Sequence, residues 1–339
     1  MKVTTFGLDL AKRVFQLHWV DMETGEICRR QLKRAQMAEF FANREASLIA
    51  MEACGSAHYW ARKLAAMGHE VRLIAPQFVK PFVKGNKTDA ADAQAIWEAA
   101  QRPGMRFVAL KSEAQQGVLL LHRMRSQLVK MRTMQVQQLR GLLYEFGADL
   151  PQGRQRGMAR IPAELERLEQ TLPAMVIDTL RGQIKRIEAL DKDIADIEKK
   201  LAAWKKEDKS ARRLMEVPGV GLLTATASVA TVGDAKAFRN GREFAAFLGL
   251  VPRQSGTGGR VKLLGISKRG DVYLRTLLIH GARAVITSAK ERDPWLERLL
   301  TRRPKNAAVV ALANKMARTI WALLAHDRTY QRDYAAQAV

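Results

Sequence analysis

Acidic residues are scarce in this chain relative to basic ones. Its 339 residues include 34 Asp and Glu against 57 Lys and Arg, which gives a formal net charge of +23 and a pI of about 10.4. This imbalance excludes an ordinary neutral metabolic enzyme and favours a polyanionic partner, because each Lys or Arg that neutralises a phosphate releases a counterion. The excess is +5 over residues 1–110, +5 over 111–210 and +13 over 211–339. We therefore expect the last third to contact nucleic acid most heavily.

Cysteine and histidine are also rare. Cys28 and Cys54 are the only cysteines and cannot build a disulfide framework, and the six histidines include no pair with the spacing of zinc ligands.

The N-terminal segment carries Asp9 inside its only apolar stretch, unlike a secretory signal. Two basic residues interrupt the apolar segment Ala307–Ala325, which falls short of roughly 18 uninterrupted apolar residues. We expect a cytoplasmic protein without a membrane anchor.

Residues 1–110 have the pattern of a mixed α/β domain. Three consecutive strands are expected first, and helices then alternate with strands. The expected strands are 3–10, 14–21, 26–33, 47–53, 70–74 and 106–110, and the expected helices are 37–43, 57–67 and 88–100. The sequence thus predicts one α/β domain in this first third.

Residues 111–210 change to a helical pattern. Apolar residues recur at three-to-four spacing from Leu121 to Phe146, and again from Leu190 to Trp204 after a Pro/Gly/Arg-rich break at 151–157. This period predicts a helical hairpin or coiled coil, within one chain or between protomers; two helices packed on their own domains are the alternative. Residues 211–339 predict a mainly helical domain with a Gly/Arg-rich loop at 252–270, so the fold class is α/β plus α.

Four carboxylates in residues 1–110 lie in apolar strands or together at the start of a helix. Asp9 and Glu52 each fall within or at the end of an apolar strand, and Asp89 and Asp92 are three residues apart at the start of a helix. Helix capping and a chance acid at a sheet edge are the simpler interpretations. Their combination in one domain instead predicts a site for two Mg²⁺ ions about 3.5–4 Å apart, since magnesium prefers oxygen ligands.

These acids carry a family resemblance. Gly-Leu-Asp at Asp9, then Glu52, then Lys-Thr-Asp-Ala-Ala-Asp at 87–92, resemble the DEDD transposases of bacterial insertion sequences. The segments 247–259 and 268–275 resemble the C-terminal transposase domain of the same family. The resemblance implies a RuvC-like, ribonuclease H-like N-terminal domain, element-end and target DNA as substrates, and a structured noncoding guide RNA that base-pairs with both DNAs.

Ser255 lies in the most basic part of the sequence. Glycines follow it directly, and they allow a backbone to approach phosphate closely. The nearby cations expected to bind nucleic acid are Arg253, Arg260, Lys262, Lys268, Arg269 and Arg275, and Arg283 ends the same basic stretch. From the residues alone, a phosphate-binding loop is favoured; the resemblance implies instead that Ser255 is the nucleophile that becomes covalently joined to DNA. Its general base is not identifiable, and we expect a homo-oligomer whose protomers share the active site.

Two other functions compete with this interpretation. His280 and Arg283 match the His-x-x-Arg pair of tyrosine recombinases, with Tyr330 downstream, although a core histidine is the simpler interpretation of His280. A non-catalytic nucleic-acid-binding scaffold is the third possibility. The segment Val217–Gly221 resembles a helix-hairpin-helix turn, and a tight interhelical turn explains it equally well.

Overall fold

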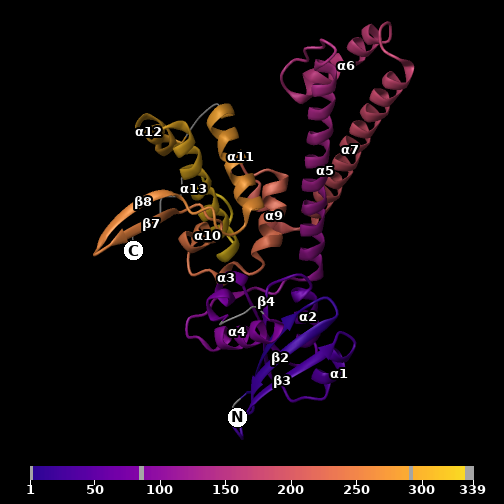
Figure 1. Cartoon of the computed structure of the whole chain (residues 1–339). Coiled ribbons are helices and arrows are strands. Elements are labelled where there is room, and N and C mark those ends of the chain that lie inside the picture. Colours follow the sequence, from indigo (N-terminus) through magenta and orange to yellow (C-terminus); the bar gives the residue numbers. More distant parts are fainter. Residues whose placement is uncertain (1–2, 84–87, 290–292, 333–339) are drawn as a thin grey trace. The chain divides into compact units, whose positions relative to one another are not determined.

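The computed structural model describes residues 3–83, 88–289 and 293–332, and these divide into two compact units (Figure 1). The first unit comprises residues 1–114 with 232–237, and the second comprises 115–231 with 238–339. The second unit contains both the long central helices and the later basic segment. The division into three domains stays a prediction.

The first unit is built on a six-stranded sheet of order β3-β2-β1-β4-β5-β6. Neighbouring strands β1, β2 and β3 are antiparallel, β1, β4 and β5 are parallel, and β6 returns antiparallel to β5. The strands are β1 (Thr5–Leu10), β2 (Val14–Val20), β3 (Ile27–Lys33), β4 (Leu48–Glu52), β5 (Glu70–Ile74) and β6 (Phe107–Val108). The α/β pattern predicted for this region is confirmed.

The helices of this unit cover the two faces of the sheet. They are α1 (Gln36–Ala42), α2 (Ala57–Ala65), α3 (Pro76–Val79) and α4 (Asp89–Gln101), with short 3-10 turns at Lys80–Phe82 and Ala235–Ala237. Because side chains alternate along a strand, Phe6 and Leu8 of β1 enter the core beneath α1 and α2. Gly7, between them, faces α4 on the other side. The same alternation places Asp9 on the α4 face.

The second unit begins with a long antiparallel helix pair. The helix α5 (Glu113–Tyr144) runs beside α7 (Ala174–Glu207), and α6 (Arg154–Leu168) packs on both in one apolar core. Arg125 of α5 pairs with Glu198 of α7 at 2.7 Å, and Arg132 pairs with Asp191 at 2.6 Å. The predicted pair of long helices therefore forms within one chain. The sequence did not predict α6.

The rest of the second unit is a helical bundle with one β-hairpin. Its elements are α8 (Lys209–Leu214), α9 (Leu222–Val232), α10 (Gly241–Phe247), β7 (Pro252–Thr257), β8 (Arg260–Ile266), α11 (Val272–Ser288), α12 (Pro294–Arg302) and α13 (Lys305–Ala325). The segment predicted as a Gly/Arg-rich loop is thus a two-stranded hairpin. Gly258 and Gly259, at φ of 58° and 79°, form its two-residue turn, a conformation that glycine adopts without strain.

The helix α13 supplies the centre of this bundle. By length and composition it could cross a membrane, with a mean hydropathy of 1.3 over 18 residues, but 44% of that window is buried inside the unit. It packs against α10, where Gly241 meets Arg318, and against α11, where Gly281 meets Met316. The core helix of a folded unit explains this apolar composition.

The segment Val217–Gly221 is a turn packed against α11. Val217 and Val220 are buried, and Gly219 has φ of +84°. A Cβ atom added to Gly281 of α11 would lie 2.0 Å from the carbonyl oxygen of Gly219. This close backbone contact accounts for Gly219, whereas a Cβ atom on Gly221 would meet no atom within 4 Å.

Substitution by alanine should change the free energy of unfolding in opposite directions at two helical glycines, because Gly281 lies in this close contact and Gly182 does not. Gly281→Ala should lower the free energy of unfolding by about 1–3 kcal/mol, because the new methyl group overpacks the turn. Gly182→Ala, in α7, should raise it by about 0.5–1 kcal/mol, since its added Cβ meets nothing closer than 3.9 Å. Urea unfolding followed by circular dichroism measures both; an equal shift in the same direction would contradict the assignment.

Candidate active site

The start of α4 is fixed by its cap and by its contact with β1. The Thr88 hydroxyl accepts a hydrogen bond from the backbone N–H of Ala91 at 3.2 Å, so helix capping is real here. A Cβ atom on Gly7 would lie 2.3 Å from the carbonyl oxygen of Ala93, so only glycine allows α4 to approach β1 this closely. The approach carries the first turn of α4 to the end of β1.

Three carboxylates meet at this point. Carboxylate oxygens of Asp9, Asp89 and Asp92 all lie within 4.8 Å of one another. Asp9 and Asp92 are half-buried and Asp89 is exposed. The capping role of Thr88 therefore coexists with a cluster of acids. Lys87, the first residue of the predicted Lys-Thr-Asp motif, lies outside the described residues.

Glu52 lies on the neighbouring strand. The parallel register pairs Gly7 with Ala50 and Leu8 with Met51, so Glu52 follows on the same side of the sheet as Asp9. Glu52 does not belong to the group within 4.8 Å, but its charge raises the pKa of Asp9. The charges of Glu52 and Asp9 also help burial to raise the pKa of the Cys54 thiol. The four predicted acids thus share one end of the sheet.

The position of Asp9 within the cluster shifts the pKa of this residue. Burial first, and then the charges of Asp92, Asp89 and Glu52, raise the pKa of Asp9 to about 6. The ionised carboxylates repel one another, so a bound cation would relieve that repulsion. Magnesium sits about 2.1 Å from each oxygen, so two ligands of one ion are at most about 4.2 Å apart. Three oxygens on one octahedral ion include cis pairs only about 3.0 Å apart, so rotation of the side chains would close the cluster around an ion. The all-oxygen donor set fits a hard divalent cation.

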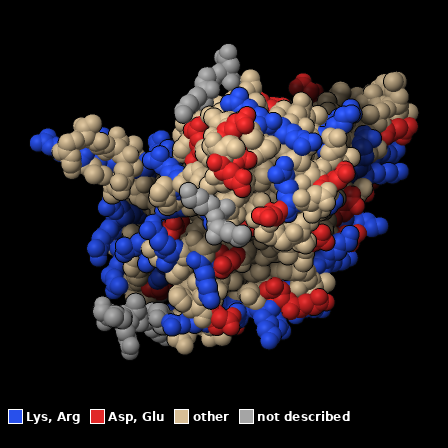
Figure 2. All heavy atoms as spheres, turned by 90° about the horizontal axis from the view of Figure 1, so that it is seen from below, with Lys and Arg blue, Asp and Glu red and all other residues tan. Residues whose placement is uncertain are grey.

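Ser255 lies on the exposed hairpin of the second unit. It belongs to β7 and pairs in the antiparallel register with Lys262 of β8. Both strands are exposed almost throughout. The predicted cations Arg253, Arg260, Lys262, Lys268 and Arg269 are also exposed, as is Arg283. Lys and Arg side chains are widespread on the face of the molecule in Figure 2, with Asp and Glu among them.

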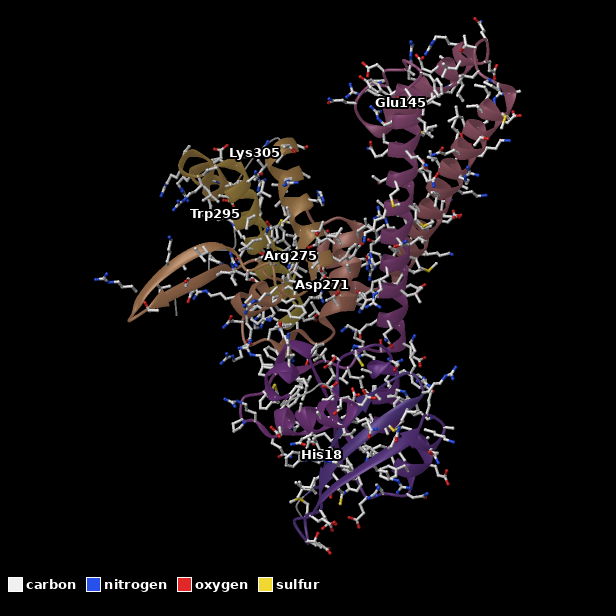
Figure 3. All side chains as sticks on the ribbon, in the orientation of Figure 1. His18, Glu145, Asp271, Arg275, Trp295 and Lys305 are labelled. Atoms are coloured by element: carbon white, nitrogen blue, oxygen red, sulfur yellow. The ribbon has the colours of Figure 1, made fainter. Side chains whose placement is uncertain are left out.

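Arg275 differs from the other predicted cations. It is 7% exposed, and its guanidinium donates to the carbonyl oxygens of Leu248 at 2.8 Å and Arg269 at 3.0 Å. Asp271, one turn earlier, caps α11 by accepting a hydrogen bond from the backbone N–H of Leu274 (Figure 3). The structure therefore gives Arg275 a structural role in place of the predicted nucleic-acid contact: it joins the segments that lead into and out of the hairpin.

His280 and Arg283 are exposed on α11. The simpler interpretation of His280 as a buried core histidine is therefore wrong. Tyr330 lies beyond α13 and is half-buried.

Sequence reasoning missed a buried polar network in the second unit. His122 of α5 is 1% exposed, and its ring nitrogens lie 3.0 Å from the hydroxyls of Tyr273 and Thr226. Burial, followed by the charge of Arg125, lowers the pKa of His122 to about 4. A neutral histidine here joins α5 to α9 and α11. The one sequence signal for this role is the position of His122 among the apolar residues of α5.

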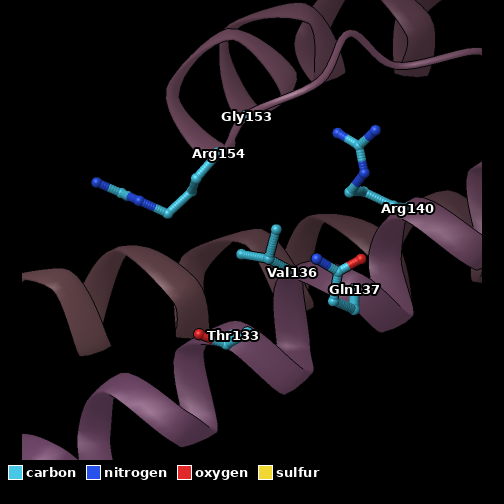
Figure 4. Close-up of a pocket in the computed structure, with 6 residues that line it drawn as sticks. All are labelled: Thr133, Val136, Gln137, Arg140, Gly153 and Arg154. Atoms are coloured by element: carbon cyan, nitrogen blue, oxygen red, sulfur yellow. The ribbon is translucent and has the colours of Figure 1, made fainter. Parts of the chain in front are cut away.

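A small pocket lies between α5 and the start of α6 (Figure 4). Its lining residues are Thr133, Val136, Gln137, Arg140, Gly153 and Arg154. Arg140 donates to the carbonyl oxygens of Leu150 and Pro151, and Arg154 pairs with Asp191. Both guanidinium groups thus stabilise the helix connection, and the lining offers no carboxylate for chemistry.

The raised pKa of Asp9 predicts a pH-dependent stability effect. A folded pKa of about 6, above the unfolded value near 3.8, stabilises the fold below pH 4, and this contribution is lost as pH rises through 6. In chelator at pH 7.5, Asp9→Asn should therefore be more stable than the unsubstituted protein. The full shift is worth about 3 kcal/mol, and solvent screening of this half-exposed group reduces it to about 1–2. Thermal unfolding at pH 7.5 and at about pH 3 measures the difference, which should vanish at the lower pH because Asp9 is then protonated in both the folded and the unfolded state.

The contact at Gly7 predicts a metal-binding effect without any ligand being changed. Gly7→Ala should push α4 away from β1 and weaken divalent-cation binding at least tenfold. Gly117→Ala in α5, whose added Cβ meets no atom within 4 Å, is the matched control and should bind as the unsubstituted protein does. Titration calorimetry with Mg²⁺ compares them; equal affinities in both variants would refute the role of Gly7.

Two family models match this chain. Residues 6–147 match a family model for DEDD transposases, and residues 211–298 match the model described as "Transposase IS116/IS110/IS902 family". These two ranges contain all four acids and Ser255.

Three relatives match along nearly the whole chain. A "Probable family 20 transposase" of Pseudomonas aeruginosa is 52% identical over 98% of this chain and 99% of its own length. The "Transposase for insertion sequence element IS1111A" of Coxiella burnetii is 44% identical over 97% and 92%. The "Transposase for insertion sequence element IS1328" of Yersinia enterocolitica is 38% identical over 97% of this chain and 99% of its own length.

Transposases cleave DNA and transfer its strands, so the non-catalytic scaffold is excluded. The chain belongs to the IS116/IS110/IS902 family of transposases.

Proposed function

We propose that this transposase cleaves and rejoins DNA in a Mg²⁺-dependent reaction at the carboxylates of its first unit. The convergence of Asp9, Asp89 and Asp92 within 4.8 Å carries the proposal, and the charge of Glu52 adds to it. These four residues would hold the ions. Bound Mg²⁺ would supply charge stabilisation to the attacking and leaving oxygens of a phosphodiester.

Ser255 is the proposed nucleophile. Its exposed hydroxyl oxygen forms a bond to the phosphorus of the scissile phosphodiester, and the bond from phosphorus to the leaving strand breaks. The hydroxyl proton of Ser255 ends on the oxygen of the leaving strand, so the exchange needs no further reactant. Arg253, Arg260, Lys262, Lys268 and Arg269 surround this position in the sequence and supply positive charge for the DNA.

The partners proposed beyond DNA are a noncoding guide RNA and further copies of the chain. A net charge of +23 suits simultaneous contact with RNA and DNA backbones. Base pairing by an RNA would leave the protein to contact backbone and shape. A dimer or tetramer would provide enough copies of each unit to act on paired DNA ends.

Adduct mapping tests the proposed chemistry. Purified protein with its co-purified RNA is incubated with element-end DNA and Mg²⁺, and the covalently attached residue is identified by mass spectrometry. We expect a Ser255–DNA adduct that falls at least 100-fold in Ser255→Ala, in Asp9→Ala and in chelator. Lys209→Ala, at an exposed cation distant in sequence from both motifs, is the control and should retain the adduct.

Two outcomes would contradict the proposal. A Tyr330 adduct, abolished by Tyr330→Phe and retained in Ser255→Ala, would establish the tyrosine mechanism instead. Cleavage without any covalent adduct would leave a hydrolytic reaction at the carboxylates and remove Ser255 from the chemistry.

A further inference from the structure

The hairpin that carries Ser255 has a defined register. Thr257 pairs with Arg260 across the two-residue turn, Gly256 pairs with Val261, and Ser255 pairs with Lys262. A Cβ atom on Gly256 would lie 2.0 Å from the carbonyl oxygen of Arg260, so the backbones of the two strands approach each other closely beside Ser255. This close approach holds Ser255 and Lys262 opposite each other.

The register separates the hairpin into two chemically different faces. Paired residues of antiparallel strands project to the same side, and side chains alternate along each strand. Thr257, Arg260 and Lys262 therefore share the face of Ser255. Val261, which is 63% exposed, projects to the opposite face. The hydroxyl of Ser255 and two cations are thus presented together on one surface.

We propose that Lys262 is a catalytic residue that holds the scissile phosphate against Ser255, an inference that rests on the proposed function of Ser255 as nucleophile. Directly opposed residues have Cβ atoms about 4.5–5.5 Å apart, so the long Lys262 side chain reaches a phosphate in contact with the Ser255 hydroxyl. Its ammonium donates hydrogen bonds to a non-bridging phosphate oxygen. Arg260 continues the same face and holds the adjoining backbone phosphate.

The catalytic role of Lys262 follows from the position at which negative charge develops on the phosphate. As the Ser255 oxygen bonds to phosphorus, negative charge grows on the non-bridging oxygens before the leaving strand departs. A donor aimed at those oxygens stabilises this state more than the bound substrate, so its removal slows the reaction more than it weakens binding. The buried Arg275, bonded to backbone carbonyls, cannot supply that donor.

The test separates the catalytic role of Lys262 from general attraction for DNA. The variants are Lys262→Ala, Lys262→Arg and the exchange Val261→Lys with Lys262→Val, which keeps the net charge and moves the cation to the opposite face. Val261→Ala is the control. Single-turnover formation of the Ser255–DNA adduct and the DNA dissociation constant are measured at one ionic strength.

We expect Lys262→Ala and the exchange variant to slow adduct formation about 100-fold or more, with the dissociation constant rising less than fivefold. Lys262→Arg should recover at least tenfold of the lost rate, and Val261→Ala should match the unsubstituted protein. Unchanged rates in Lys262→Ala, or losses of rate and affinity by the same factor, would overturn the role of Lys262 while leaving Ser255 as the nucleophile. A wild-type adduct on a residue other than Ser255 would overturn both.

Discussion

The contact between α4 and β1 at Gly7 is the constraint on which the candidate active site depends. Without a side chain at Gly7, the backbone of α4 comes close enough for its first turn to reach the end of β1. Asp9 then meets Asp89 and Asp92, which the i, i+3 spacing places on one side of the helix. The parallel register of β4 brings Glu52 to the same edge. The steric condition at Gly7 and the parallel register of β4 together position acids from three elements.

The clustered carboxylates repel one another, and this repulsion indicates that the cluster binds a cation. Burial first, and then the charges of the neighbouring carboxylates, raise the pKa of Asp9, which means that the fold is opposed by its own site when the acids are ionised. A divalent cation converts this repulsion into attraction. In a chain of net charge +23, the acids therefore form a local negative centre within a protein that otherwise attracts phosphates.

Much of this arrangement could be predicted from the sequence because it depends on short-range patterns. Strand alternation and helical period located the six strands of the sheet, α4 and the two long helices, and the spacing of Asp89 and Asp92 showed that they share a face. The sequence predicts a loop where the hairpin lies, because glycines and arginines obscure the alternation of β7. Its two-residue Gly258-Gly259 turn was the available signal. The burial of Arg275 and the His122 network depend on contacts between distant segments, which local patterns do not encode.

Anomalous diffraction from crystals grown with Mn²⁺ would show directly whether the carboxylates of Asp9, Asp89 and Asp92 bind a divalent cation. Mn²⁺ takes the same oxygen ligands as Mg²⁺ and can be located without assumptions about the protein. We expect an anomalous peak within about 2.3 Å of carboxylate oxygens of Asp9, Asp89 and Asp92, and loss of that peak in Asp9→Asn. Manganese bound elsewhere, with these three carboxylates free of metal at saturating concentration, would contradict this expectation.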